Sequence, residues 1–308
     1  MLVPAFASKG FSSVRKIIQT MSEFIADPVL ISAYDLHISR GKVKQASVAF
    51  APLVFLDSGG YEASTKTDLS DTLKTKHDPL RWTVTMHSEV LKMWNFSTPT
   101  VLISYDHPGR RETLEMQLAG AMRLFARYPA AVAREILLKP EPGKRGKLDI
   151  EAIVGAVERL GDVEIVGLTE KELGRSTFER MVNIARLRIA LRESGKDKPI
   201  HVFGSLDPIS TPLYFLSGAD IFDGLTWLRF AFRDRFALYK HNYGAVELDI
   251  STPDDLVNGH IWSRNYHYMA DMQGRLRQYL LNGDFEVFGP NGPLLRSCSE
   301  RVLESVGG

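Results

Sequence analysis

Three aspartates of this 308-residue chain follow short apolar segments in a way that could assemble a catalytic centre. Asp57 ends the segment V-F-L-D, Asp106 ends T-V-L-I-S-Y-D, and Asp223 lies within A-D-I-F-D-G. Carboxylates gathered at one place repel one another unless they do different jobs, such as nucleophile, base and acceptor for a substrate N–H. Any one of them could instead cap a helix or close a turn. The shared pattern predicts carboxylate chemistry if the fold brings the three segments together.

Two glycine-containing segments could expose backbone groups to a ligand. The four residues after Asp57 are Ser58, Gly59, Gly60 and Tyr61. The two glycines would let the chain approach a ligand closely, and the aromatic ring could cover a planar molecule. A second segment, V-E-I-V-G-L, ends at Gly167 and Leu168 and offers another bare backbone edge. An ordinary strand-to-helix turn, or close packing, would explain the same glycines.

The apolar segments are continuous runs rich in β-branched residues, which is typical of strands buried on both faces of a parallel sheet. The eight runs are residues 3–8, 28–34, 53–57, 100–106, 135–139, 163–168, 200–204 and 219–224. Segments with helical periodicity separate them, at residues 12–24, 77–95, 110–127, 149–159, 178–192 and 208–216. This alternation predicts an α/β fold of the (β/α)8 TIM-barrel type, with its active site at the carboxyl ends of the strands. A doubly wound sheet is disfavoured because no glycine-rich phosphate turn follows the first run.

The chain after the eighth run has a different character. Residues 225–250 carry basic side chains among aromatic ones, and residues 251–259 are polar and turn-like. Residues 261–281 have apolar side chains at helical spacing and predict a final helix. No segment of disordered composition separates this part from the rest. The sequence therefore predicts one domain, residues 1–308, in which residues 225–308 form a C-terminal helical extension packed on the barrel.

Composition and charge exclude several classes of protein. Hydrophobic residues make up 44% of the chain and charged residues 24%, which argues against disorder. The 38 basic and 37 acidic side chains give a net charge of +1, which leaves room only for a local basic surface. Cys298 is the only cysteine, so no disulfide within the chain and no thiolate-rich metal site can form. Because the chain has no apolar span and no signal peptide, we expect a soluble cytoplasmic protein with no membrane contact. We also expect no metal and no cofactor.

The combination of these segments resembles the tRNA-guanine transglycosylase (queuine tRNA-ribosyltransferase) family nearly end to end. D-S-G-G-Y at residues 57–61 and A-D-I-F-D-G at residues 219–224, with Arg229 downstream, carry the resemblance. Further similar segments are V-P-A-F-A-S-K-G-F, I-S-A-Y-D-L-H-I-S-R-G, S-Y-D, I-V-G-L, H-V-F-G-S-L-D-P and, near the C-terminus, S-R-N-Y-H-Y-M-A-D-M-Q-G-R-L-R-Q-Y-L. The resemblance implies a barrel enzyme, a pentosyltransferase, that exchanges guanine in a nucleic acid for a 7-deazaguanine through a covalent enzyme–ribosyl intermediate.

The resemblance also implies a role for each matching residue. Asp223 corresponds to the nucleophile, Asp57 to the general acid and base, and Asp106 to the carboxylate that binds the N–H edge of the base. Tyr61 and Phe203 correspond to the groups that lie against the two faces of the base. The other base-binding positions that the resemblance implies are Ser58, Gly59, Gly60, Lys139, Gly167 and Leu168.

The chain departs from the family mainly at the zinc site. The family's Cys-x-Cys-x-x-Cys motif has no counterpart, and Arg264 stands where the family has its zinc histidine. Lys139 and Glu62 stand in place of two family glutamines. Because the zinc region helps to shape the tRNA contact surface, its loss favours the DNA-acting branch, which inserts 7-cyano-7-deazaguanine or a derivative into DNA. A divergent tRNA enzyme is the alternative, and a duplex substrate would call for a helper protein that opens it.

Basic residues after the eighth run are predicted to bind the phosphates of the nucleic acid. They are Arg229, Arg233, Arg235 and Lys240. Because they follow the strand that carries Asp223, we expect them at the barrel mouth, beside a nucleotide taken out of its stack. A solvated surface helix would carry the same residues.

Two other functions fit the same sequence features. A non-catalytic accessory subunit of a transglycosylase would keep the fold, although this chain also keeps the aspartates. A glycoside or nucleoside hydrolase could use the same carboxylates on a small substrate. The histidines His107, His201 and His267 are expected to have structural roles.

Overall fold

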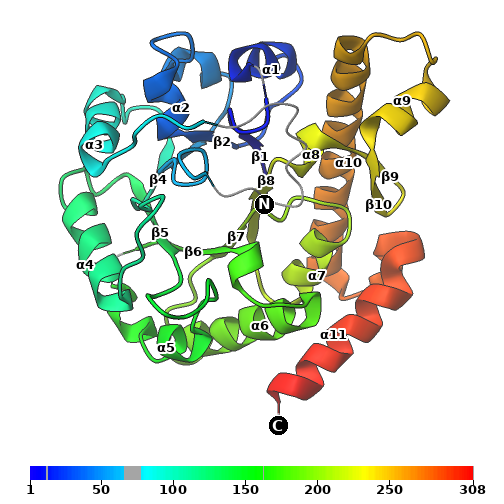
Figure 1. The fold of residues 1–308 in the computed structure, drawn as a ribbon. Coiled ribbons are helices and arrows are strands. Elements are labelled where there is room, and N and C mark those ends of the chain that lie inside the picture. The colour runs from blue at the N-terminus through cyan, green and yellow to red at the C-terminus, as the bar shows by residue number, and fades with distance from the viewer. Residues whose placement is uncertain (12, 66–77, 162, 308) are drawn as a thin grey trace.

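The computed structural model describes residues 1–11, 13–65, 78–161 and 163–307. Eight parallel strands form a closed barrel in their order along the chain, and helices surround it (Figure 1). The predicted (β/α)8 fold with a C-terminal helical extension is therefore confirmed. The strands are β1 (Leu2–Phe6), β2 (Val29–Ser32), β3 (Val54–Asp57), β4 (Thr100–Ile103), β5 (Ala133–Leu138), β6 (Ile165–Thr169), β7 (Ile200–Phe203) and β8 (Ile221–Gly224).

Burial on both faces explains why the strands read as continuous apolar runs. Every residue of β1, β2, β3, β4, β7 and β8 is buried. The register then decides which residues become neighbours in adjacent strands. It places Ser32 of β2 beside Asp57 of β3, and Gly167 of β6, which has no side chain, beside His201 of β7.

Helices and short 3-10 turns connect the strands around the outside of the barrel (Figure 1). They are α1 (Val14–Met21), α2 (Ala33–Ile38), η1 (Gln45–Val48), α3 (Val84–Met93), α4 (Leu114–Phe125), α5 (Ile150–Val154), η2 (Val157–Leu160), η3 (Glu170–Glu172), α6 (Thr177–Glu193) and α7 (Ser210–Leu216).

Side-chain caps decide where several helices begin. The Thr83 side chain accepts a hydrogen bond from the Met86 N–H, so α3 begins at Val84 and the predicted helix 77–95 is too long at its start. Ser32 caps α2 in the same way, which ends β2 before the predicted residue 34. Ser13 caps α1. His77 and Ser12, the first residues of two predicted helices, lie outside the described residues.

The C-terminal extension contains more regular structure than the sequence indicates. Its elements are α8 (Thr226–Arg229), β9 (Phe230–Arg233), β10 (Phe236–Tyr239), α9 (Lys240–Glu247), α10 (Asp254–Asn282), η4 (Phe285–Asn291) and α11 (Gly292–Val306). The turn expected at residues 251–259 is wrong for residues 254–259, because α10 begins at Asp254 behind the Pro253 N-cap. The antiparallel β9–β10 hairpin and α11 were not predicted.

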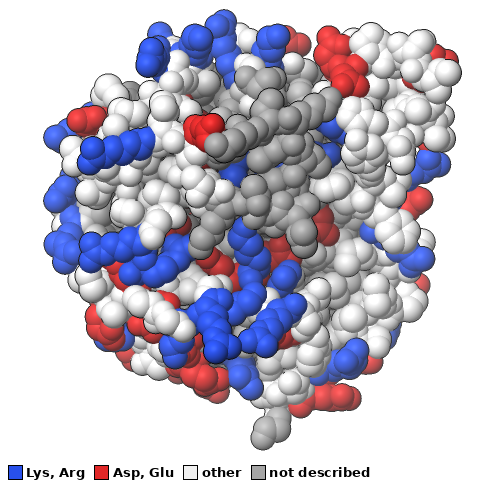
Figure 2. Space-filling view, in the orientation of Figure 1, with Lys and Arg blue, Asp and Glu red and all other residues white. Residues whose placement is uncertain are grey.

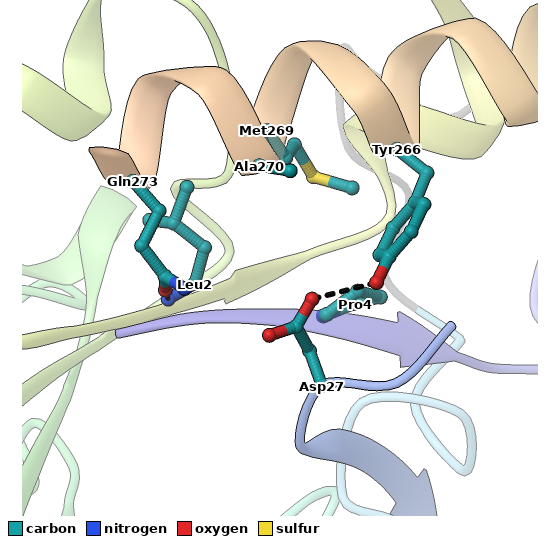
Figure 3. Close-up of a pocket in the computed structure, with 7 residues that line it drawn as sticks. All are labelled: Leu2, Pro4, Asp27, Tyr266, Met269, Ala270 and Gln273. Carbon is teal, nitrogen blue, oxygen red and sulfur yellow. Dashed lines mark hydrogen bonds between the residues drawn. The ribbon is translucent and has the colours of Figure 1, made fainter. Parts of the chain in front are cut away.

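Helix α10 holds the extension against the barrel (Figure 1). The buried Asn265 amide donates to the Trp227 and Phe230 carbonyls and accepts from the Phe232 N–H, at 2.6–2.7 Å. At the amino-terminal end of β1 a small pocket separates α10 from the strand, and there Tyr266 Oη donates to Asp27 at 2.7 Å (Figure 3). This pocket is therefore at the opposite end of the barrel from the predicted site.

Along the described stretches of the chain, none of the helices has both the length and the apolar composition that crossing a membrane requires.

Candidate active site

The three aspartates singled out in the sequence lie together at the carboxyl end of the barrel. Asp57 ends β3, Asp106 lies three residues beyond the end of β4, and Asp223 is the last residue but one of β8. The negative charges of Asp223 and Asp106 both act on Asp57 and raise its pKa. Gly60 lies directly against Asp106, since a Cβ on Gly60 would be 2.7 Å from Asp106 Oδ2. The fold thus brings the three carboxylates into one neighbourhood.

Asp57 is buried, and its surroundings favour the protonated form. Burial raises its pKa to about 7, opposed by the Gly59 N–H that donates to Oδ2 at 3.0 Å. No cation forms an ion pair with Asp57 in the described part of the chain. At neutral pH this side chain is therefore close to half protonated, which suits a group that must both give and take a proton.

The glycines after Asp57 are required by contacts within the protein. Gly59 has φ of +86°, and a Cβ there would be 2.4 Å from the Cβ of Tyr34. Gly60 needs its lack of a side chain because of Asp106, as described above. The Ser58 carbonyl accepts a hydrogen bond from Trp82 Nε1 at 2.9 Å. These contacts hold the loop firmly, so the backbone of Ser58, Gly59 and Gly60 has a defined shape before any ligand arrives.

A buried histidine contacts Asp223. The His201 imidazole lies between two carboxylates, with Nδ1 2.8 Å from Glu135 Oε1 and Nε2 3.3 Å from Asp223 Oδ1. Burial lowers the pKa of His201, but the two carboxylates outweigh burial and raise the pKa to about 9. His201 is thus an imidazolium at neutral pH, and it stabilises negative charge on Asp223. The Gly204 N–H also donates to Asp223 Oδ1, at 3.1 Å.

Phe203 and Gly167 lie against this histidine. The Phe203 ring stacks on the His201 ring, with centroids 4.0 Å apart and planes 25° apart. A Cβ on Gly167 would be 2.6 Å from Glu135 Oε1 and 2.7 Å from Phe203 Cε2, so only glycine fits there. Because strand side chains alternate, Leu168 points to the opposite face, and it is fully buried. One face of the Phe203 ring is therefore taken by the protein.

Asp106 belongs to a cluster of alternating charges. Arg111 Nη1 is 3.2 Å and Lys139 Nζ is 3.7 Å from its two carboxylate oxygens. The same two cations pair with the buried Glu172, at 3.4 Å and 2.7 Å, and Lys139 Nζ also donates to Thr169 Oγ1 at 2.9 Å. Burial raises the pKa of Asp106, while Lys139 and Arg111 lower it. Lys139 is thus placed beside Asp106.

Tyr61 and Arg229 are joined at the edge of the site. Arg229 is buried, and its Nη2 donates to Tyr61 Oη at 2.9 Å and to the Lys9 carbonyl at 3.2 Å. The Lys9 ammonium lies 4.3 Å from the centre of the Tyr61 ring. Arg229, predicted to bind phosphate at the barrel mouth, is buried here, because α8 turns its side chain inward to hold Tyr61.

The other three basic residues predicted to bind phosphate lie on the hairpin and α9, to one side of the barrel (Figure 1). Arg233 forms an ion pair with Glu247. Arg235 lies 5.5 Å from the centre of the Phe236 ring, and Lys240 Nζ donates to Asn258 Oδ1 at 2.7 Å. In this arrangement all three contact neighbours within the extension.

Sequence analysis missed His201, Glu135, Arg111 and Glu172 as members of the site. One signal was present: E-I-L-L-K and I-H-V-F-G each place an ionisable residue, Glu135 or His201, beside apolar strand residues. A buried charge needs a partner. The partners, however, come from strands 66 residues apart in sequence, and only the barrel shows that they meet.

The comparisons with known proteins give no assignment. No family model matches the sequence, and neither does any curated protein. In the described residues no group of three or more His, Cys, Asp or Glu side chains could hold a metal ion. The resemblance to tRNA-guanine transglycosylases therefore remains a prediction from the motifs, and the site is interpreted from its own geometry.

Proposed function

We propose that this protein is a nucleic-acid base-exchange glycosyltransferase, which replaces guanine by a 7-deazaguanine through a covalent aspartyl–sugar intermediate. The single observation that supports this most is the different surroundings of two neighbouring carboxylates. Asp57 has a pKa raised to about 7, whereas Asp223 contacts the imidazolium of His201. A protonated acid beside an ionised nucleophile is the pair that displacement at a sugar carbon with a covalent intermediate requires.

In the first step, a carboxylate oxygen of Asp223 forms a bond to C1′ of the sugar. The bond from C1′ to the guanine nitrogen breaks, and its electron pair leaves with the base. Asp57 gives its proton to the departing guanine, so the base leaves neutral and Asp57 becomes a carboxylate.

In the second step, a 7-deazaguanine takes the place of the guanine. Asp57 accepts the proton from its ring nitrogen, that nitrogen attacks C1′, and the C1′–oxygen bond to Asp223 breaks. Asp106 would accept from the N–H edge of the base, and Lys139, beside it, would donate to the base carbonyl oxygen. Asp57 is then protonated again and Asp223 is again a free carboxylate, so one exchange leaves the enzyme unchanged.

We favour DNA as the polymer, because the chain lacks the cysteines of the zinc region that shapes the tRNA contact. A tRNA substrate is the second candidate. The 7-substituent that we expect on the incoming base is a cyano group or its derivative.

Label exchange tests the proposal. The protein would be incubated with radiolabelled guanine and, separately, with single-stranded DNA, duplex DNA and tRNA. We expect label to enter one polymer and a denaturant-resistant protein–nucleic acid adduct to form with the same polymer. Asp223→Asn should lose both signals. Label entry that persists undiminished in Asp223→Asn would overturn the proposal, as would release of guanine from a free nucleoside with no exchange into any polymer.

A further inference from the structure

A second group of basic residues lies at the carboxyl end of the barrel, and the sequence analysis did not assign it. It comes from the loops that follow two neighbouring strands, β5 and β6, which pair with each other. Figure 2 shows Lys and Arg side chains gathered on this face over the loops that precede α5 and α6. The exposed members are Lys144, Arg145, Lys171 and Arg175, called here the β5–β6 loop surface.

Two carboxylates of the loop after β6 are used inside the protein. Glu172 is buried and pairs with Lys139 and Arg111. Glu170 accepts hydrogen bonds from Arg180 and from Tyr214 Oη, each at 2.8 Å. Lys144, Arg145, Lys171 and Arg175 are exposed while these two carboxylates face inward, so the exposed surface is basic although the whole chain has a net charge of only +1.

The two loops form one surface because a lysine joins them. Lys147 Nζ donates to the Lys171 carbonyl at 2.5 Å and to the Gly174 carbonyl at 2.9 Å. Lys144 pairs with Asp149, the N-cap of α5, at 2.7 Å. The Lys147 bonds fix the backbones of the two loops relative to each other, so the cations that they carry form one surface.

Arg145 occupies a backbone conformation that arginine rarely adopts. Its φ is +48° and that of Gly146 is +74°, in a turn closed by the Lys147 N–H and the Lys144 carbonyl at 3.0 Å. Turns of this kind favour Asn or Gly, and a non-glycine residue there costs about 1–2 kcal/mol. No ion pair engages the Arg145 guanidinium within the described residues, so its charge contributes to no contact that would offset this cost. Strained residues of this kind cluster at ligand-binding sites, so Arg145 is a candidate for contact with a ligand.

The β5–β6 loop surface borders the candidate active site. Lys139, which begins the first loop, lies 3.7 Å from Asp106. Lys171 in the second loop lies 5.9 Å from the centre of the Tyr61 ring. A chain of phosphates that crosses this surface would thus run next to the aspartates at the barrel mouth.

We propose that the β5–β6 loop surface binds the phosphodiester backbone that flanks the reacting nucleotide. This inference rests on the proposed function, because it takes a nucleic acid as the substrate. Arginine and lysine on one side of a mouth attract phosphates at every sequence and set the strand's direction relative to the site, while base contacts there select the guanine.

Binding measurements on three matched variants test the surface. The test variant is Arg145→Asn with Lys171→Gln and Arg175→Gln, in which Asn suits the Arg145 turn. The control variant, Lys92→Gln with Arg123→Gln and Arg127→Gln, removes the same charges from the ends of α3 and α4 at the other end of the barrel. A third variant, Arg233→Gln with Arg235→Gln, removes the hairpin charges.

Fluorescence anisotropy would follow labelled single-stranded DNA, duplex DNA and tRNA over a salt series. We expect the test variant to bind its preferred polymer at least about tenfold more weakly at 0.1 M salt. The slope of its log affinity against log salt concentration should be shallower by about two to three units, roughly one for each charge removed. The control variant should match the wild type, and the polymer that responds identifies the substrate.

Several results would overturn the inference: unchanged binding by the test variant to all three polymers, equal weakening by the control, weakening by the hairpin variant alone, or no binding by the wild type. Label exchange separates this inference from the proposed function. If the test variant binds more weakly but the wild type shows no label exchange, the result supports the proposed surface and rejects the proposed chemistry. If the wild type exchanges label but the test variant binds as tightly as the wild type, the result supports the chemistry and rejects the surface.

Discussion

Asp57 and Asp223 occupy similar places in the barrel, at the carboxyl ends of β3 and β8, but their surroundings act on a negative charge in opposite ways. Around Asp57 there is burial, backbone donors from Gly59 and Ser58 and two other aspartates, and its pKa rises to about 7. Around Asp223 there is an imidazolium held by Glu135, and a backbone N–H. Two identical residues are thereby prepared for opposite tasks.

The difference comes from the neighbouring strands and not from the aspartates. The two strands before β8 supply glycine at Gly167 and histidine at the facing position, His201. A larger residue at Gly167 would collide with Glu135 and Phe203, so the glycine makes space for the ion pair. The Asp57 side has no such cation among the described ion pairs, and its loop donates only backbone groups. A buried carboxylate without a cation binds its proton more tightly.

The largest effect that would test this contrast is the loss of the nucleophile. Asp223→Asn keeps the shape and the contact with His201 but cannot form a bond to C1′. We expect exchange to fall by roughly 10⁴-fold or more, since removal of a nucleophile removes the covalent route. The measurement is label exchange together with adduct formation on a denaturing gel. Glu300→Gln, on the far α11, should change neither. A surviving adduct would show that another group is the nucleophile.

Asp57→Asn should have the next largest effect, because it removes the proton donor and leaves the nucleophile. We expect kcat for base exchange to fall by about 10²- to 10⁴-fold. In the wild type, kcat/KM should decrease with increasing pH above about 7, as the protonated form of Asp57 is lost. The variant should lose this decrease. A wild-type profile that stays flat between pH 6 and 9 would contradict the assignment of Asp57 as the acid.

His201→Gln tests the other half of the comparison. Gln can still accept or donate a hydrogen bond, but it brings no positive charge next to Asp223. We expect kcat to fall by about 10²-fold while KM for the nucleic acid stays within about twofold, because the charge acts on the nucleophile and not on binding. Glu135→Gln should have a smaller effect of the same kind. A change confined to KM would mean that His201 contacts the substrate.

The sequence was sufficient to predict the barrel and the three aspartates because both depend on local patterns. Continuous β-branched runs predict buried parallel strands, and each aspartate lies within three residues of its strand's end. The partners of the aspartates depend on register between distant strands. Glu135 and His201 are 66 residues apart, and nothing in their spacing shows that they share a hydrogen bond. Each charge is predictable as an anomaly in an apolar run, but the ion pair is not.

The positions of the basic side chains in the extension also depend on the fold and not on their order after Asp223 in the sequence. Arg229, Arg233, Arg235 and Lys240 follow the strand of Asp223, but a short helix and a hairpin direct them away from the barrel axis or inward. In the β5–β6 loop surface, by contrast, residues distant from Asp223 in sequence come next to its site. The start of α10 was predictable, because Asp254 and Asp255 in the first turn after Pro253 are typical of a helix N-terminus.

The smallest effect is on stability. It tests the surroundings of Asp57 through the free energy of unfolding, without a measurement of catalysis. The pKa of Asp57 in the folded protein is raised to about 7, above the ordinary aspartate value of 3.8, so the folded protein keeps a proton that the unfolded chain has already released. This contribution to stability is complete below pH 4 and is lost as the pH rises through 7. Asn has no proton to lose. The free energy of unfolding of Asp57→Asn, relative to that of the wild type, should therefore increase between pH 4.5 and 8 by about 3 kcal/mol. Urea denaturation at several pH values measures this difference.

Asp249→Asn is the control. The Ser251 hydrogen bonds lower the pKa of that exposed carboxyl, so the free energy of unfolding of this variant, relative to the wild type, should not increase toward alkaline pH. If the Asp57→Asn difference does not change with pH, Asp57 is not the protonated partner of Asp223.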